Sequence, residues 1–285
     1  MSPRMAPAAL DLPAPDMRDG TMMDVNGASL FVTDTGGMGE PLLLLHGYPL
    51  SGALFSRVVD ELDDSYRVIT VDHRGYGKST TPSTVRNVGT YSDDALAVLR
   101  RMNVDKAHIA GMSMGGPIMF DMYRKQPSRF ASMILIDTNA KAANGIEKGI
   151  WQGARAMLNE TGDVSSIIPV LMPDMLSGDT RLNQPAQADY LTRAIKQSSL
   201  QGALGGTYVL ENRPDSMDTL RSVRVPALLI VGVEDSLYPV ELNKQMADAL
   251  PNSTLVKVPG SAHAAVFESP DVVADAMLEF LDDVD

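Results

Sequence analysis

Short, almost continuously apolar runs recur along the chain, and stretches with helical periodicity lie between them. Runs of this length and composition are typical of strands that are buried on both faces. Their alternation with helices predicts a mostly parallel sheet with helices on either side, an α/β fold. The predicted parallel strands are residues 41–46, 67–72, 107–112, 132–137, 227–232 and 254–259.

Two further strands are predicted near the start of the chain. Residues 22–25 and 30–34 flank Asn26-Gly27, and this dipeptide favours a two-residue hairpin turn. We therefore expect an antiparallel pair to lead an eight-stranded sheet. Residues 1–20 contain four prolines and no long apolar run, which predicts an extended N-terminal arm and no signal peptide.

Helices are predicted between the strands and at the end of the chain. Ser92 is placed to cap a helix, because acidic residues follow it directly and basic residues come at positions 100 and 101, as the helix dipole favours. Residues 114–126, 239–249 and 270–281 have helical periodicity. In the last of these helices, the expected buried stripe is Val272, Val273, Ala276, Met277 and Phe280.

One long interval, residues 139–222, contains no convincing strand. Its amphipathic stretches are interrupted by Pro169, Pro173, Pro185 and Pro214, which predicts several short helices. We expect this interval to form a helical cap, inserted into a core that consists of residues 21–138 and 223–285.

The composition narrows the possible partners. A formal net charge of −12 and a pI near 4.7 disfavour binding to nucleic acids or anionic membranes, which attract positive surfaces. The chain has no cysteine, so it has no thiolate metal site and no cysteine nucleophile. Its apolar runs are far shorter than the roughly 20 residues of a membrane span. We expect a cytoplasmic protein that acts on a small molecule, and its oligomeric state stays open.

A candidate nucleophile, Ser113, lies in Gly111-Met112-Ser113-Met114-Gly115, between a predicted strand and a predicted helix. This pattern is typical of a nucleophile elbow, a sharp turn that lifts a serine hydroxyl clear of the sheet. Small residues two positions away on either side let the strand and the helix approach closely. A serine in this position requires a base and an acid that orients the base.

His263 is the favoured base, because it lies on a loop after the last predicted strand. Asp235 is the favoured acid, because it follows the strand at 227–232 and gives the chain order serine, acid, histidine. Glu234 and Asp137 also follow strands and remain rivals. For each of these carboxylates, a purely local capping role is the alternative.

Two backbone N–H groups are candidates for stabilising an oxyanion. One belongs to Met114, the residue after the nucleophile, and the other to Tyr48, where Gly47 permits a tight turn after the strand at 41–46. We expect His46 to hold this loop through hydrogen bonds and to have no chemical role.

Other chemistries fit the sequence less well. Gly77-Lys78-Ser79 resembles the end of a phosphate-binding loop, but Asp72 stands where that motif requires glycine. The glycines at 36, 37 and 39 precede a strand, whereas a dinucleotide site follows one. The four histidines are far apart in the sequence. We therefore expect neither a cofactor nor a metal ion.

Four motifs together resemble those of the α/β-hydrolase superfamily, and the resemblance extends from about Asn26 to Leu281. They are His46-Gly47-Tyr48-Pro49, Asp72-His73-Arg74-Gly75-Tyr76-Gly77-Lys78-Ser79, the elbow from Gly111 to Gly116, and Gly260-Ser261-Ala262-His263. A narrower similarity to bacterial carboxylesterases related to 3-oxoadipate enol-lactonase lies in Asp137-Thr138-Asn139-Ala140 and in Asn212-Arg213-Pro214-Asp215-Ser216. Serine at position 113 separates the chain from epoxide hydrolases and haloalkane dehalogenases, which carry aspartate there.

The resemblance implies cofactor-free acyl transfer on a small carboxylic ester or lactone, in which Ser113 attacks, His263 relays the proton and Asp235 orients it. Enol-lactone or carbon–carbon bond hydrolysis and perhydrolysis use the same machinery, and a noncatalytic ligand receptor is the alternative of another class. We expect Trp151, Met172, Leu237 and Val266 to line the substrate pocket. Packing between helices would account equally well for the large apolar residues of the cap.

Overall fold

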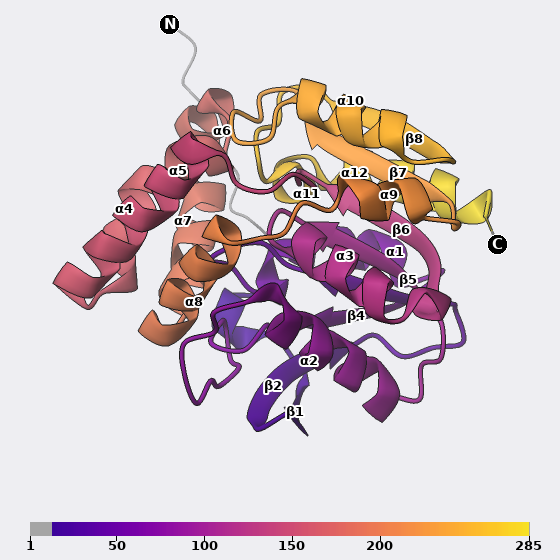
Figure 1. Ribbon diagram of the computed structural model, residues 1–285, viewed down its shortest axis with the longest axis horizontal. Helices are drawn as coiled ribbons and strands as arrows, with labels where there is room; N and C mark the ends of the chain where they lie inside the picture. The colour runs from indigo at the N-terminus through magenta and orange to yellow at the C-terminus, as the bar shows by residue number, and fades with distance from the viewer. Residues whose placement is uncertain (1–12, 285) are drawn as a thin grey trace, which may run out of the picture.

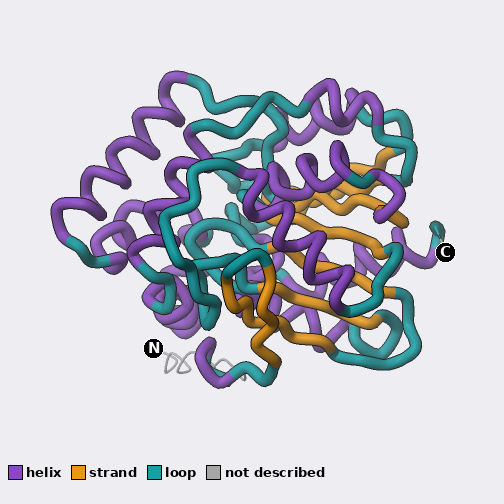
Figure 2. The backbone as a smooth tube through the Cα atoms, turned by 60° about the horizontal axis from the view of Figure 1, so that its bottom comes forward, coloured by secondary structure: helices purple, strands orange, loops and turns teal. Residues whose placement is uncertain are grey.

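The computed structural model describes residues 13–284, and it contains one twisted eight-stranded sheet with helices on both faces (Figures 1 and 2). The strands follow one another in space in the order β1-β2-β4-β3-β5-β6-β7-β8. The first two strands are antiparallel to each other and β2 is antiparallel to β4, while all other neighbours are parallel. Their bounds are β1 Thr21–Val25, β2 Ala28–Asp34, β3 Pro41–Leu45, β4 Arg67–Val71, β5 Ala107–Met112, β6 Phe130–Ile136, β7 Ala227–Gly232 and β8 Ser253–Val258.

The predicted α/β-hydrolase sheet is confirmed, and each predicted strand agrees with an observed one to within two residues at either end. Strand β8 differs from the others in burial, because its residues are exposed or half-buried up to Lys257 and only Val258 is buried. This strand has only one neighbour, β7, because it forms the edge of the sheet. Helices α10 and α12 from the two faces both contact β8, but its place at the edge leaves most of its side chains partly exposed.

Two groups of helices cover the sheet (Figure 1). Helices α1, α11 and α12 contact one another on one face, and α2, α3, α9 and α10 form a contacting series on the other. The chain moves in one direction along the sheet from β3 to β4 and in the other from β4 to β5, so right-handed crossovers place α1 and α2 on opposite faces. Their bounds are α1 Ser56–Leu62, α2 Val88–Arg101, α3 Gly115–Lys125, α9 Met217–Ser222, α10 Val240–Ala249, α11 Ala265–Glu268 and α12 Pro270–Asp282.

Between β6 and β7 the chain forms further helices, and we call residues 137–226 the inserted segment. Figure 1 shows α4–α8 gathered beyond one end of the sheet, whereas α9 contacts α3 and α10 beside the sheet. The bounds are α4 Gly145–Thr161, α5 Ile168–Met175, α6 Gly178–Asn183, α7 Pro185–Lys196 and α8 Leu200–Glu211. In the described part of the chain, no helix is both long and apolar enough to cross a membrane.

The expected cap at Ser92 is wrong, because α2 begins one turn earlier. The side chain of Asn87 accepts a hydrogen bond from the N–H of Thr90 at 3.2 Å and caps the helix. Ser92 is buried inside the helix, where its hydroxyl donates to the carbonyl of Gly89 at 3.0 Å. The prediction took the acidic pair at 93 and 94 as the first turn of the helix. The true first turn contains the apolar residues Val88 and Tyr91, which are buried and precede that pair.

The predicted stripe of α12 is wrong at one position. Val272 is 45% exposed, whereas Val273 and Met277 are fully buried. Ala276 and Phe280 are half-buried and pack against the core. Leu281, one helical turn after Met277, completes the buried face. The stripe is therefore centred on Val273, Met277 and Leu281.

Part of the predicted N-terminal arm is packed against the core. Residues 1–12 lie outside the described region, but Pro15–Met17 forms a 3₁₀ turn, and the Arg18 side chain that follows is only 8% exposed. Its guanidinium donates to both carboxylate oxygens of Asp72, at 2.9 and 2.8 Å. Asp72 also accepts the N–H groups of Gly52 and Lys78. This buried ion pair joins the start of the chain to the loop after β4.

Replacing Arg18 with methionine is expected to lower the free energy of unfolding by about 3 kcal/mol, because a buried carboxylate loses its charged partner. Urea denaturation measures this change. The matched control is Arg67→Met, which removes the more exposed pair with Asp34 and is expected to cost at most about 1 kcal/mol. Equal losses in the two variants would contradict a special role for Arg18.

Candidate active site

The three predicted catalytic residues lie on loops that follow the carboxyl ends of parallel strands. The strand order reverses at β3, which has β4 on one side and β5 on the other. Open α/β sheets bind their ligands in the crevice at such a switch point. Register aligns Leu45 of β3 with Gly111 of β5, so the loop at Gly47 and Tyr48 leaves the sheet beside the turn at Ser113.

Ser113 occupies a strained turn between β5 and α3. Its φ is +52°, a left-handed conformation that is costly for a residue with a side chain. A Cβ atom at Gly115 would lie 2.2 Å from the carbonyl oxygen of Leu45. A Cβ atom at Gly111 would lie 2.6 Å from the carbonyl oxygen of Gly115. Only glycine at these two positions lets the strand and the helix come this close, as the elbow prediction requires.

The structure brings Ser113, His263 and Asp235 together in one hydrogen-bonded chain. The Nε2 atom of His263 lies 2.8 Å from the Oγ of Ser113, and its Nδ1 lies 2.9 Å from Oδ2 of Asp235. The exposed fractions of the three residues are 6%, 1% and 3% in the order Ser113, His263, Asp235. If Asp235 is ionised, Nδ1 carries the proton, and Nε2 is then free to accept the proton of the serine hydroxyl.

Local geometry keeps Asp235 in its ionised form. Its Oδ1 accepts the N–H groups of Leu237 and Tyr238 at 2.9 and 3.0 Å. Burial by itself would raise the pKa of Asp235, but the His263 ring and these two N–H groups outweigh burial and hold the pKa below its usual value. The Tyr238 ring packs edge-on against the His263 ring with centroids 5.4 Å apart.

Neither rival carboxylate bonds to His263. Glu234 is exposed. Asp137 is fully buried at the end of β6, and its oxygens accept the N–H groups of Gly232 and Ala265 at 2.8 and 3.1 Å. Burial and the nearby Asp235 carboxylate raise the pKa of Asp137 well above its usual value. Asp137 therefore links β7 to the loop that carries His263.

The N–H groups of Tyr48 and Met114 are both available beside Ser113. Among the hydrogen bonds within residues 13–284, none uses either of them as a donor. A Cβ at Gly47 would lie 2.6 Å from the sulfur of Met112 and 3.0 Å from the Cβ of Ser113, which shows how closely this loop approaches the turn.

His46 bonds to the backbone of two loops. Its Nδ1 donates to the carbonyl of Gly47 and its Nε2 accepts the N–H of His73, both at 2.9 Å. Burial lowers the pKa of His46 to about 3, so the ring is neutral. These contacts agree with the predicted loop-holding role.

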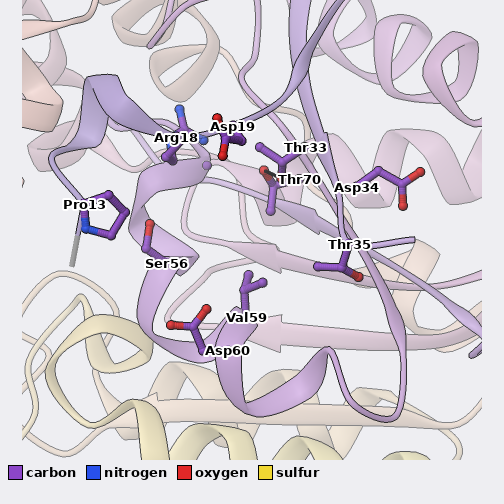
Figure 3. A pocket seen from close by; sticks show the side chains of 11 residues that line it. Pro13, Arg18, Asp19, Thr33, Asp34, Thr35, Ser56, Val59, Asp60 and Thr70 are labelled. Atoms are coloured by element: carbon purple, nitrogen blue, oxygen red, sulfur yellow. Dashed lines mark hydrogen bonds between the residues drawn. The ribbon is translucent and has the colours of Figure 1, made fainter. Parts of the chain in front are cut away.

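The predicted pocket residues come from several elements. The Trp151 ring of α4 meets the Tyr48 ring edge-on with centroids 5.6 Å apart. Leu237 follows Asp235, Val266 lies in α11 after His263, and Met172 is a half-buried residue of α5. A separate open pocket of about 240 Å³ lies beside Arg18, Thr33, Thr70 and Asp60. Figure 3 shows its lining side chains, and no predicted site residue is among them.

Sequence reasoning missed two residues that hold the site together. Thr138 donates to the carbonyl of Ser113 at 2.6 Å, and Glu268 of α11 accepts the N–H of Ala262 next to His263. The position of Thr138 after a predicted strand was a usable signal. Nothing in the sequence around Glu268 indicates its role, because the role depends on how α11 packs.

Comparisons with known proteins agree with the class that this sheet and elbow define. Residues 40–270 match the family model of the alpha/beta hydrolase fold, so the chain belongs to the α/β-hydrolase family. An esterase from Thermogutta terrifontis is 30% identical, with a TM-score of 0.87 over 93% of this chain and 97% of that one.

Two further proteins extend the comparison. The AB hydrolase superfamily protein YisY of Bacillus subtilis is 28% identical over 262 residues, which are 88% of this chain and 95% of that protein. The enol-lactonase from Burkholderia xenovorans shares the fold, with a TM-score of 0.85 and 20% identity over 92% of this chain and 99% of that one. Membership of this family supports a hydrolase activity.

The raised pKa of Asp137 predicts a pH dependence of stability. The folded chain holds this proton at pH values where the unfolded chain has lost it, so the contribution of Asp137 to stability falls as pH rises above the unfolded value of 3.8. Asp137→Asn cannot ionise and lacks this fall. We expect the free energy of unfolding of Asp137→Asn, relative to that of the native protein, to increase as pH rises above the unfolded value of 3.8. Urea titrations measure this difference, and parallel pH curves would contradict it.

Proposed function

We propose that this protein is a serine-dependent hydrolase of small carboxylic esters or lactones. The observation that carries the proposal is the hydrogen-bonded chain from Ser113 through His263 to Asp235, placed at the switch point of an α/β-hydrolase sheet. The esterase from Thermogutta terrifontis, at 30% identity over nearly the whole chain, supports the ester class.

The proposed reaction has two acyl-transfer steps. The Oγ of Ser113 attacks the ester carbonyl carbon while Nε2 of His263 takes the hydroxyl proton, and the imidazolium then protonates the leaving alcohol oxygen. Water attacks the resulting acyl-serine ester with His263 again as base, and the acid leaves as Ser113 regains its proton. Asp235 holds the imidazole in the required tautomer and stabilises its charged form.

The N–H groups of Tyr48 and Met114 are the proposed oxyanion hole. Both lack a protein acceptor in the described chain and both adjoin Ser113. Donors that are already oriented lower the barrier because they need no rearrangement as charge develops on the carbonyl oxygen.

We further propose that α4–α8 act as a cap over this site and that Trp151, Met172, Leu237 and Val266 contact the substrate. The ring contact between Trp151 of the cap and Tyr48 of the oxyanion loop supports this arrangement. Apolar walls with a few polar groups at the reacting centre suit a small uncharged ester.

A second serine–histidine–carboxylate chain provides an internal comparison. The Oγ of Ser132 lies 2.9 Å from Nδ1 of His108, and Nε2 of His108 lies 3.0 Å from the carboxylate of Glu40. Ser132 is fully buried inside strand β6, so its hydroxyl has neither access to a substrate nor a turn that presents it. We assign no reaction to this serine.

Replacing Ser113 with alanine is expected to lower kcat for p-nitrophenyl acetate by at least about 10⁴-fold and to leave the melting temperature within a few degrees of the native value, because the change removes only the nucleophile. Ser132→Ala is the matched control and should keep its activity. A fluorophosphonate probe should label the native protein at Ser113 alone. Absence of labelling in folded native protein would favour a noncatalytic receptor.

Replacing Asp235 with asparagine is expected to lower kcat by about 10³- to 10⁴-fold, because the amide favours the wrong tautomer of His263. Asp137→Asn should lose much less, because Asp137 does not bond to the imidazole and acts only on the N–H groups of Gly232 and Ala265. Steady-state kinetics on the same ester compare the two variants. A larger loss in the Asp137 variant would reverse the assignment of the acid.

A further inference from the structure

The inserted segment meets the histidine loop at the end of helix α5. This helix contains Pro173 and ends at Met175, and the chain then becomes extended at Leu176. The last carbonyl groups of a helix lack partners within it. The carbonyls of Asp174 and Met175 accept the N–H groups of His263 and Ala264, at 3.3 and 2.8 Å. The backbone of the proposed base is therefore bonded directly to the inserted segment.

The same stretch also reaches the loop of the proposed acid. The Oγ of Ser236, the residue next to Asp235, donates to the carboxylate of Asp174 at 2.7 Å. Residues 174–177, which we call the α5 exit, thus contact both loops that supply the histidine and the aspartate. Movement of this stretch would disturb the two loops together.

Glu268 of α11 joins the α5 exit to the histidine loop. Its side chain is almost fully buried, at 8% exposure for the residue. One carboxylate oxygen accepts the N–H of Ser177 at 2.8 Å and the other accepts the N–H of Ala262 at 2.6 Å. Bonds between N–H groups and a carboxylate are stronger than neutral ones, and a buried carboxylate needs them.

We propose that Glu268 is a positioning residue whose carboxylate clamps the α5 exit to the loop of His263, so that the inserted segment must be docked for the base to be aligned with Ser113. This inference rests on the proposed function, because the alignment of His263 with Ser113 matters only if these two residues are catalytic. Glu268 itself bonds to neither Ser113 nor Asp235. Glu268 acts through the backbone of the two loops, and the carbonyls of Asp174 and Met175 complete the same clamp.

The N–H of Ser177 can be removed without altering Glu268. Ser177 has φ of −57° and follows Leu176 at φ −122° and ψ 142°, and both conformations suit a proline at position 177. Ser177→Pro deletes the N–H that donates to Glu268. The proline ring then occupies the space between the backbone nitrogen and the Glu268 carboxylate. Ser177→Ala is the matched control, because it also loses the serine cap of α6 but keeps the N–H.

Relative to Ser177→Ala, we expect Ser177→Pro to lower kcat for p-nitrophenyl acetate by roughly tenfold or more, since small displacements of catalytic groups are costly. The rate of fluorophosphonate labelling at Ser113 should fall in parallel, with a smaller change in KM. The melting temperatures of the two variants should agree within a few degrees. Equal kcat and equal labelling rates in the two variants would overturn the proposal.

Glu268→Gln provides a second test that keeps the shape of the side chain. Its amide can accept only one of the two N–H groups, because its NH₂ group faces the other. We expect a loss of kcat and of labelling rate here too, and native values for both would overturn the proposal even if Ser177→Pro does not fold. If the native protein is neither labelled nor active, the proposed function has failed. If it is active and the variants match their controls, only the clamp has failed.

Discussion

The backbone of Ser113 is held in its left-handed turn by the end of β6 and the residues directly after it, and the geometry of the site depends on this contact. The N–H of Ser113 donates to the carbonyl of Ile136 at 3.0 Å, and its carbonyl accepts the hydroxyl of Thr138 at 2.6 Å. Between these two partners stands Asp137, which is itself left-handed with φ of +43°. Two strained residues at neighbouring strand ends thus fix each other, and packing on both sides of the sheet keeps them there.

Three buried carboxylates surround the histidine loop, and their environments give them different tasks. Asp235 faces the imidazole and its pKa is lowered, whereas the pKa of Asp137 is raised by burial and by the Asp235 charge. The raised pKa of Asp137 opposes a second negative charge beside that of Asp235. Glu268 bonds to the backbone of the loop on the other side of His263. The imidazole is therefore oriented by one carboxylate, while its loop is held by two others.

The sequence predicted the features that depend on local pattern. Buried strands have continuous apolar runs, and the elbow has a characteristic spacing of glycines at 111 and 115 around the serine, so both could be recognised without coordinates. The start of α2, the burial of Arg18 and the clamp at Glu268 depend on contacts between segments far apart in the chain. The local sequence around a charged residue does not show whether its side chain is paired inside the protein or exposed to solvent. Only the fold decides which partner it contacts.

The two serine–histidine–carboxylate chains show why a hydrogen-bonding pattern alone does not define a reactive site. Ser132 and His108 lie inside neighbouring strands β6 and β5, where strand conformation directs backbone N–H groups to the adjacent strand. Ser132 is also fully buried, so a substrate carbonyl cannot reach its hydroxyl. At the carboxyl ends, the strands stop and the chain turns, so N–H groups such as those of Tyr48 and Met114 are left without acceptors in the described chain. The proposed acyl transfer therefore depends on where the sheet ends, whereas the hydrogen-bonded chain of Ser132, His108 and Glu40 has no N–H groups arranged in this way.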